Sequence, residues 1–410
     1  MINLLWAIML LCSLAVAFGN LIFYQNAETF DLLVSAIFKN AQAAVDISIG
    51  LIGILSFWLG ILKLVEESEI SHKISKGLSP LFRVIMKDIP KDSPAISTIV
   101  LNMAANFLGL DNAATPMGLK AMEQLQQHNK NKDTASDAEI LFMIINASSV
   151  TLIPITIFMY RAQMGAARPT DVFIPILLAT SVSTIVGFFL VAIKQKINLF
   201  HPLLLKTFWG FILFISLIAF GFYQLDYTKR MAVSSALGNI ILLSLIGVVL
   251  VSCVKKRIRC YEAFVEGAKE GFGVAIRIIP YLLAMLVAVG AFRAAGILDL
   301  IIDGIRGLCG FLGCDSRFAD ALPTAFMKPL SGSGARAMMI ETMQNFGADS
   351  FAAFASSVVQ GSTETTFYVL TVYFGAINVS KTRYALKYAL LSDLAGIVAA
   401  ILLSYLFYAE

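Results

Sequence analysis

Four short stretches gather amide, hydroxyl and charged side chains within a mostly apolar chain, and they are its best candidates for chemistry. Two of them are NMAANFLGLDNAATPMG, which starts at Asn102, and NASSVT, which starts at Asn146. The others are PLSGSGARA, which starts at Pro329, and QGSTETT, which starts at Gln360. Amides read the hydrogen-bond pattern of a small solute, while hydroxyls, carboxylates and backbone carbonyls are oxygen ligands for cations.

The rest of the chain has the composition of a membrane protein. Of its 410 residues, 58% are hydrophobic and 14% are charged, whereas a soluble domain carries roughly a quarter charged residues. Apolar runs of about the 20 residues that a spanning helix needs cover residues 3–24, 45–65, 139–160, 171–193, 207–224, 231–254, 274–295, 351–378 and 388–408. We therefore predict an all-α polytopic membrane protein whose first helix is uncleaved. Basic tracts with interleaved aromatics, which would indicate nucleic-acid binding, are missing from the sequence.

The segment near residues 96–125 is apolar but interrupted. An unpaired backbone group in hydrocarbon costs several kcal/mol, so a broken helix at membrane depth survives only inside the protein or beside a watery cavity. We expect Gly109 to end a first helix and Thr115 to cap a second one, with Pro116 at its first position. The prediction is a re-entrant hairpin with a polar tip.

A second interrupted segment lies near residues 318–345. We expect one helix to end at Pro329 and the next to open near Ser331 or Ser333, where two glycines let the backbone approach a ligand closely. Exposed N–H groups at such a helix start carry partial positive charge and suit an anion. An amphipathic piece, EGAKEGFGVAIR from Glu266, is expected to lie along the membrane interface.

The order of these motifs occurs twice along the chain, with Ser148 opposite Ser362. We predict a first repeat at 1–195, a linker with an extra membrane helix at 196–230, and a second repeat at 231–410. An extra span turns the second repeat upside down, and the basic loops then lie in the cytoplasm together with the N-terminus. A parallel duplication is the alternative.

The predicted substrate-binding residues all come from the four polar stretches. They are Asn102, Asn106, Asp111, Asn112, Thr115, Asn146, Ser148, Ser149, Thr151, Ser331, Gly332, Ser333, Gly334, Arg336, Gln360, Ser362, Thr363, Glu364 and Thr365. Any single Ser or Thr has a simpler role in capping its own helix. Four clusters at matching positions of two repeats favour a site at the bilayer midplane between the hairpins. Asp111 and Glu364 are predicted to couple Na⁺ or H⁺, because an ionisable group in a membrane helix is costly and marks function.

These features predict a secondary transporter for a small polar or anionic solute, nucleoside-like or amino-acid-like, with no cofactor other than Na⁺. A passive channel and a non-transporting scaffold or assembly factor remain alternatives. We do not expect an enzyme, because the sequence has no nucleophile elbow, metal-ligand spacing or phosphate loop. Substrate, coupling ion and direction stay open, as does a disulfide between Cys309 and Cys314, which would need an oxidising compartment.

Long motifs resemble one known family. NMAANFLGLDNAATPMGLKAM and NASSVTLIP are similar to spore maturation protein A, whereas PLSGSGARA and QGSTETTFYVLTVYFGA are similar to spore maturation protein B. The resemblance covers nearly all of the chain and makes it look like a fusion of the two. That family is grouped under a nucleoside-recognition, or Gate, domain. The resemblance implies a multi-pass protein of the bacterial inner membrane that contacts lipid and forms a homo-oligomer, and the domain label does not establish a substrate.

Overall fold

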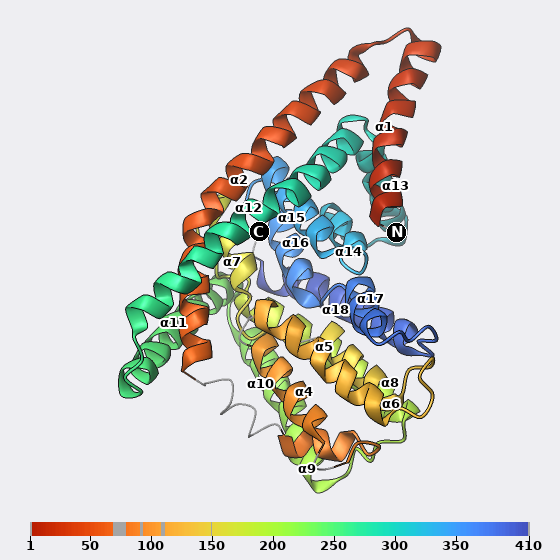
Figure 1. Cartoon of the computed structure of the whole chain (residues 1–410). Helices are drawn as coiled ribbons and strands as arrows, with labels where there is room; N and C mark the ends of the chain where they lie inside the picture. Colours follow the sequence, from red (N-terminus) through yellow and green to blue (C-terminus); the bar gives the residue numbers. More distant parts are fainter. Residues whose placement is uncertain (1, 69–78, 91–92, 108–110, 149, 409–410) are drawn as a thin grey trace. The chain divides into compact units, whose positions relative to one another are not determined.

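The structure is a computed structural model, and helices make up its regular elements (Figure 1). It describes residues 2–68, 79–90, 93–107, 111–148 and 150–408. Over these residues every regular element is a helix, and no β-strand forms. The all-α class predicted from the sequence is therefore confirmed.

Seven helical stretches within the described residues are long and apolar enough to cross a membrane. They are α1 (Ile2–Tyr24), α2 (Glu28–Glu67), α8 (Phe173–Lys194), the continuous stretch Pro202–Gln224, α11 (Tyr227–Lys255), α12 (Cys260–Ala294) and α18 (Ala385–Phe407). The stretch Pro202–Gln224 joins α9 (Pro202–Leu204), a π-helical turn (Leu205–Trp209) and α10 (Gly210–Gln224). The chain is a multi-pass membrane protein, as its composition predicts.

The shorter helices carry the interrupted segments and their neighbours. They are α4 (Pro94–Phe107), α5 (Asp111–His128), α6 (Asp137–Ala147), α7 (Ile155–Gln163), α13 (Ile297–Leu312), α14 (Leu322–Met327), α15 (Gly332–Phe346), α16 (Phe351–Ser362) and α17 (Thr366–Ala376). A 3₁₀ turn at Arg317–Ala321 precedes α14.

The chain divides into two compact units, and each is built from segments far apart in sequence. Unit 1 comprises Met1–Gly60, Ile157–Pro169 and Val265–Gln360. Unit 2 comprises Ile61–Thr156, Thr170–Phe264 and Gly361–Glu410. Each unit therefore takes material from both halves of the chain, and each is described by itself below.

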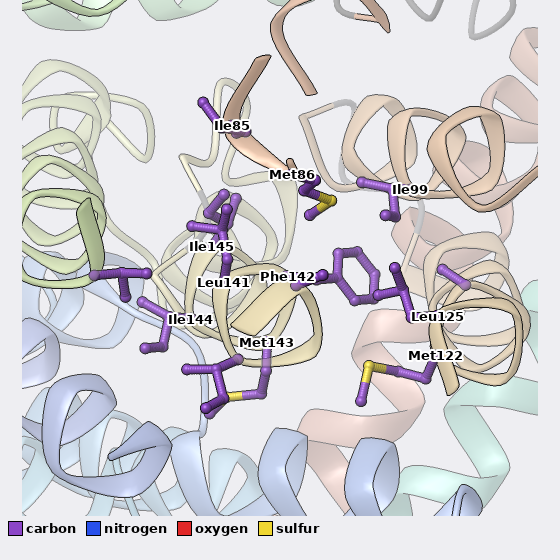
Figure 2. Close-up of a cluster of buried hydrophobic side chains, with 14 of the residues drawn as sticks. Ile85, Met86, Ile99, Met122, Leu125, Leu141, Phe142, Met143, Ile144 and Ile145 are labelled. Carbon is purple, nitrogen blue, oxygen red and sulfur yellow. The ribbon is translucent and has the colours of Figure 1, made fainter. Parts of the chain in front are cut away.

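The core of unit 2 surrounds α6, which is buried on every side from Ala138 to Ala147. Figure 2 shows Phe142 and its apolar neighbours, among them Ile99 of α4 and Leu125 of α5. A helix that is apolar all round belongs in an interior. Its start is fixed by a capping box, in which the Ser136 hydroxyl accepts from the Glu139 N–H and the Glu139 carboxylate accepts from the Ser136 N–H at 2.7 Å.

Helices α8 and α18 of unit 2 pack through small residues. Ser183 and Ser392 bond each other, with 3.0 Å between their hydroxyl oxygens and 2.7 Å from Ser392 Oγ to the Ser183 carbonyl. A side chain at Gly396 would lie 2.9 Å from Ser183 Cβ. Small residues of this kind let helices approach closely where no hydrophobic effect drives their association.

Helices α2 and α12, most of whose residues belong to unit 1, are single long helices of 40 and 35 residues. The segment from Glu266 was predicted to be a separate interfacial piece, and this was wrong, because it forms the N-terminal part of α12. Gly271 in this part packs tightly against α2: a Cβ there would lie 2.6 Å from the Ser56 backbone nitrogen. The first helix joins this packing through a 2.9 Å bond from Trp6 Nε1 to the Ala284 carbonyl.

The predicted start of the second hairpin helix was also wrong. Helix α5 begins at Asp111, and Pro116 lies inside it rather than at its first position. Proline removes one backbone hydrogen bond from a helix. Pro116 is the sixth residue of α5 and so lies beyond the first four N–H groups, which have no partner within a helix in any case; the bond lost is the one to the carbonyl four residues earlier.

Candidate functional site

Three asparagines and a tyrosine form a polar cluster in unit 2, which we call the amide cluster (Asn102, Asn106, Asn146 and Tyr373). Asn106 Nδ2 donates to Asn146 Oδ1 at 2.8 Å, and the Tyr373 hydroxyl donates to the same oxygen at 3.3 Å. Asn102 lies one turn before Asn106 on α4, with 3.5 Å between Asn106 Nδ2 and Asn102 Oδ1. Helices α4, α6 and α17 thus converge on one hydrogen-bonded group, and its described members carry no formal charge.

The amide cluster also closes the first helical hairpin. Asn102 is fully buried, and its Nδ2 donates to the Ala114 carbonyl of α5 at 2.7 Å. Helices α4 and α5 lie side by side (Figure 1). Gly118 of α5 leaves room for the cluster, since a side chain there would overlap the Tyr373 hydroxyl and lie 3.0 Å from Asn102 Nδ2. Asn106 is only half-buried, so it is the member through which the cluster can meet a ligand.

A cavity of about 390 Å³ within unit 2 is lined in part by chain neighbours of two members of this cluster. Its lining includes Phe107, which follows Asn106 on α4, and Ile145, which precedes Asn146 on α6. Most of the wall is apolar and aromatic, and the hydroxyls of Thr184 and Thr207 are its polar points. Thr207 belongs to the π-helical turn, a feature frequent at functional sites. Small-molecule pockets are typically apolar cavities of about 300–1,000 Å³ with a few placed polar groups.

Two broken helices meet in unit 2. The first break separates α6 from α7 and the second separates α16 from α17, as the sequence predicts for the two polar kinks. The Glu364 N–H, within the second break, donates to the Ala147 carbonyl at the end of α6 at 2.9 Å. Ser148 is buried and bonds the Ile144 carbonyl, while its own carbonyl accepts from Thr184. This hydrogen bond therefore pairs a backbone group of one break with a backbone group of the other.

Several hydroxyls in the second break remain without a hydrogen-bond partner among the described residues. Thr363 Oγ1 and Thr366 Oγ1 are buried in this way. Thr365 is the N-cap of α17, yet its side chain makes no capping bond. Glu364, in contrast, is exposed. Buried polar atoms without partners are costly, and in native structures they call for an explanation such as a bound ligand.

The second hairpin lies in unit 1, where Ser331 caps α15. Its hydroxyl accepts from the Gly334 N–H at 3.0 Å and lies 3.2 Å from the Ser333 hydroxyl. The predicted helix start at this serine is confirmed. The missing Cβ of Gly334 makes room for the methyl group of Met285, which would lie 3.0 Å away, so here the glycine serves side-chain packing.

Cationic side chains gather along this hairpin and the helices of unit 1 that accompany it. The Arg336 guanidinium lies over the Tyr160 ring, 5.5 Å from its centroid. Arg336 Nε and the Tyr160 hydroxyl are buried without a hydrogen-bond partner among the described residues. Arg161 is 1% exposed and donates to the Ser357 hydroxyl at 3.3 Å, and Lys328 is also buried. Arg336 Nε, which has no hydrogen-bond partner among the described residues, suits a ligand with acceptor or anionic groups.

Each unit combines one hairpin with half of each broken helix. In unit 2, α6 and α17 pair through stacked rings of Phe142 and Tyr373, whose centroids are 5.7 Å apart. In unit 1, α7 and α16 pair through Arg161, which lies 5.9 Å from the Phe354 ring centroid. The first half of one broken helix thus pairs with the second half of the other in both units.

The structure brings together only part of the predicted site. Asn102, Asn106 and Asn146 form one cluster, whereas Ser331, Ser333 and Arg336 form another in the other unit. Gln360 is buried in unit 1 with its carbonyl oxygen unpartnered among the described residues, and Thr151 is half-buried in unit 2. Ser149 and the side chains of Asp111 and Asn112 lie outside the described residues, and Thr115 lies half-buried on α5.

Sequence reasoning missed Tyr373, Arg161 and Asp393. Tyr373 stands in an apolar run and gives no local signal. Arg161 and Asp393 are charged residues inside or beside apolar runs, and that contrast could have identified them. Over the described residues there is no group of three or more His, Cys, Asp or Glu side chains able to hold a metal ion, and all five cysteines are free thiols, Cys309 and Cys314 included.

Comparisons with known proteins agree with the motif-based resemblance. The Gate family, described as nucleoside recognition, matches residues 48–167 and 275–380. Spore maturation protein A of Bacillus subtilis (strain 168) is 40% identical over 185 residues, which cover 45% of this chain and 91% of that protein. Spore maturation protein B of the same strain is 46% identical over 157 residues, which cover 38% of this chain and 86% of that protein. No solved structure matches the chain significantly.

Proposed function

Because the chain belongs to the Gate (nucleoside recognition) family, we propose that it is a secondary transporter of a small polar solute, with the amide cluster as its recognition surface. The solute would be nucleoside-like or amino-acid-like, with an uncharged hydrogen-bonding edge. Amides offer donors and acceptors together, so such a cluster can match a solute edge that does the same. The bacterial inner membrane is the proposed location, with the N-terminus in the cytoplasm.

One observation carries this proposal: chain neighbours of two amide-cluster residues line a cavity large enough for a small solute. The cavity of about 390 Å³ is flanked by Phe107 and Ile145, the chain neighbours of Asn106 and Asn146. Aromatic walls suit the flat face of a ring, while the half-buried Asn106 suits its polar edge. A scaffold without transport has no need of a polar group beside such a space.

The hairpin of unit 1 supports a second polar contact. The first turn of α15 presents backbone N–H groups at the positive end of a helix, and Arg336 lies on the next turn. We propose that these groups, within unit 1, bind an acceptor or anionic group of a ligand.

We further propose that the chain arose by internal duplication with inverted topology. Two separate matches to one family support the duplication. The exchange of half-helices supports it as well, because α6 pairs with α17 and α7 pairs with α16. Transporters built from inverted repeats bind substrate at discontinuous helices, which both breaks provide.

The test uses the purified full-length protein in a thermal-shift screen against nucleosides, amino acids and organic anions. The solute found is then followed in proteoliposome uptake with and without an ion gradient. Asn106→Ala should abolish the shift and the uptake while the protein stays folded, because Asn106 is half-buried. Asn198→Ala is the matched control, since this asparagine is an exposed amide of the same unit.

The outcomes separate the three functions. Saturable uptake that depends on a gradient and is lost in the Asn106→Ala variant supports the transporter. Uptake that does not saturate would indicate a channel. Absence of any solute-dependent shift and of any uptake would favour the scaffold and contradict the proposal.

A further inference from the structure

Helix α13 has three faces of different character, and the first packs against its own unit. Leu298 and Ile302 are buried against Ala319 of the 3₁₀ turn. The half-buried Ile305 lies beside them, and Leu322 of α14 adds to the contact. Positions 298, 302 and 305 are spaced four and three apart, which places them on one side of a helix. This face therefore joins α13 to the start of the hairpin in unit 1.

The second face carries every charged residue of α13, namely Asp299, Asp303 and Arg306. All three are exposed, and each forms an ion pair. Arg306 bonds Asp303 at 3.0 Å and Asp320 at 2.8 Å, while Asp299 bonds Arg293 at 2.8 Å. Charged groups are costly to remove from water, so this face belongs in an aqueous surrounding. It holds more acidic than basic groups and has no surplus of positive charge for anionic lipid.

The third face of α13 is apolar and open. Leu300, Leu308, Phe311 and Leu312 are 73%, 58%, 88% and 63% exposed, respectively. They recur from the first turn of the helix to its last. An exposed apolar patch of this kind marks contact with another surface.

Two observations identify that surface as the membrane interface. Helix α13 has 16 residues, so it is about 24 Å long, which is too short to cross a hydrocarbon core of roughly 30 Å. It also follows α12, one of the helices of membrane-spanning length, after only Ala295 and Gly296. Gly296 has a φ of 76°, a left-handed conformation that changes the direction of the chain. Since a spanning helix ends at the membrane surface, α13 begins there.

We propose that α13 lies in the plane of the membrane interface, with Leu300, Leu308, Phe311 and Leu312 inserted among the lipid acyl chains. An amphipathic helix in this position buries its apolar face about 5–10 Å into the boundary between headgroups and chains. The charged face then meets water, and the third face stays on the protein. Lipid is thus the partner of the apolar face, and the contact depends on apolar area rather than on anionic headgroups.

The interfacial position of α13 also fixes the depth of the hairpin that follows it. Arg306 Nη2 donates to both carboxylate oxygens of Asp320, at 2.9 and 2.8 Å, in the 3₁₀ turn that leads into α14. Charge-assisted bonds of this kind are stronger than neutral ones. Helix α14 leads in turn to Ser331, the N-cap of α15. This membrane contact lies within unit 1 and does not depend on the proposed transport function.

The test measures how deep nitroxide labels on α13 lie in the bilayer. The full-length protein is placed in phosphatidylcholine nanodiscs with and without phosphatidylglycerol. Serine replaces the more accessible cysteines, Cys12, Cys260 and Cys314, while the two buried thiols stay. Single labels are then attached to the variants Leu300→Cys and Phe311→Cys. Their collision with oxygen, which dissolves in lipid, is compared with their collision with a water-soluble nickel chelate.

Both labels should collide more with oxygen than with the chelate, and both should lie at the same depth. Leu300 and Phe311 are three turns apart, on nearly the same side of the helix and separated by about 16 Å along its axis. A helix perpendicular to the membrane plane would therefore give depths that differ by that distance. Adding phosphatidylglycerol should change neither depth.

Gly310→Cys is the matched control for Phe311→Cys. Gly310 lies four residues after Arg306, on the charged face, and nothing lies within 4 Å of the position of its missing Cβ. Its label should collide more with the nickel chelate than with oxygen.

Three results would overturn the interfacial helix. The labels at Leu300 and Phe311 could prefer the chelate, which would place this face in water, or their depths could differ by the length of the intervening helix. Shielding from both reagents would mean that protein covers the face, and spectral broadening that grows with the labelled fraction would identify a second copy of the chain. If the cysteine variants do not fold, Phe311→Trp and Gly310→Trp in the otherwise unchanged protein decide. Brominated acyl chains should quench the added fluorescence of Phe311→Trp more strongly, and equal quenching overturns the proposal.

Discussion

Replacing Gly118 by alanine should displace the tyrosine that completes the amide cluster. The added methyl would overlap the Tyr373 hydroxyl and lie 2.6 Å from Tyr373 Cζ. The ring cannot swing aside easily, because it is 6% exposed and stacked on Phe142 with an interplanar angle of 5°. The hydroxyl must therefore leave Asn146, and the hydrogen bond between them is lost.

The magnitude follows from three contributions. Overpacking by a methylene-sized group costs about 1–3 kcal/mol, and the lost hydrogen bond costs about 1 kcal/mol. Alanine is a better helix former than glycine by about 1 kcal/mol, which offsets the second contribution. The free energy of unfolding should therefore fall by about 1–3 kcal/mol, most of it from overpacking.

The assay is the unfolding free energy in mixed detergent micelles for Gly118→Ala and for Gly375→Ala. Gly375 lies on α17 like Tyr373, and nothing lies within 4 Å of the position of its missing Cβ, so the same change there should be neutral or stabilising. Adding Tyr373→Phe to Gly118→Ala should recover part of the loss, because the hydroxyl is gone. Equal stability of the two alanine variants, or no recovery in the double variant, would refute the steric argument.

Four further changes test other parts of the structure in the same unfolding assay. Ser136→Ala should cost about 1 kcal/mol by removing the cap of α6; an unchanged value would mean that the capping box is dispensable. Glu341→Gln should cost about 1.5–3 kcal/mol, because Arg293 would lose its buried charged partner but keep Asp299; Asp299→Asn, which breaks the more exposed pair of the same arginine, should cost less. Gly271→Ala should cost about 1–3 kcal/mol by forcing α12 away from α2, with Gly247→Ala as its unhindered counterpart. Burial raises the pKa of Tyr384 from 10.0 to about 12. The contribution of Tyr384 to the free energy of unfolding is therefore complete below pH 10 and is lost as the pH rises toward 12. Tyr384→Phe should remove that part of the alkaline destabilisation.

Local sequence signals predicted where helices start and break. A helix start was predicted near Ser331 or Ser333, and the structure places the N-cap at Ser331, a residue type favoured there. Hydroxyl-rich stretches marked both breaks for the same reason. The start of α5 was misplaced by one turn, since Pro116 was weighed more heavily than Asp111, an acidic residue that also suits a helix N-terminus.

Contacts between segments far apart in the chain could not be predicted from the sequence. Tyr373 joins the amide cluster because α17 packs on α6 and because Gly118, more than 200 residues earlier in the chain, leaves room for its hydroxyl. Neither residue signals this role by its neighbours. The pairing of α6 with α17 likewise depends on tertiary packing, which local preferences do not encode.

Asp393 shows how hydropathy can hide the residue with the highest energetic cost. Averaged over the 23 residues of α18, one carboxylate barely lowers the mean hydropathy, so the helix is assigned as a span and its charge is overlooked. The free energy is not averaged in this way, because a buried charge costs several kcal/mol at one position and must be offset there. Hydroxyls and amides in the broken segments, by comparison, can bond their own helices, as Ser148 does. In an apolar run, a single carboxylate therefore indicates a specific interaction at its position more strongly than a longer polar stretch does.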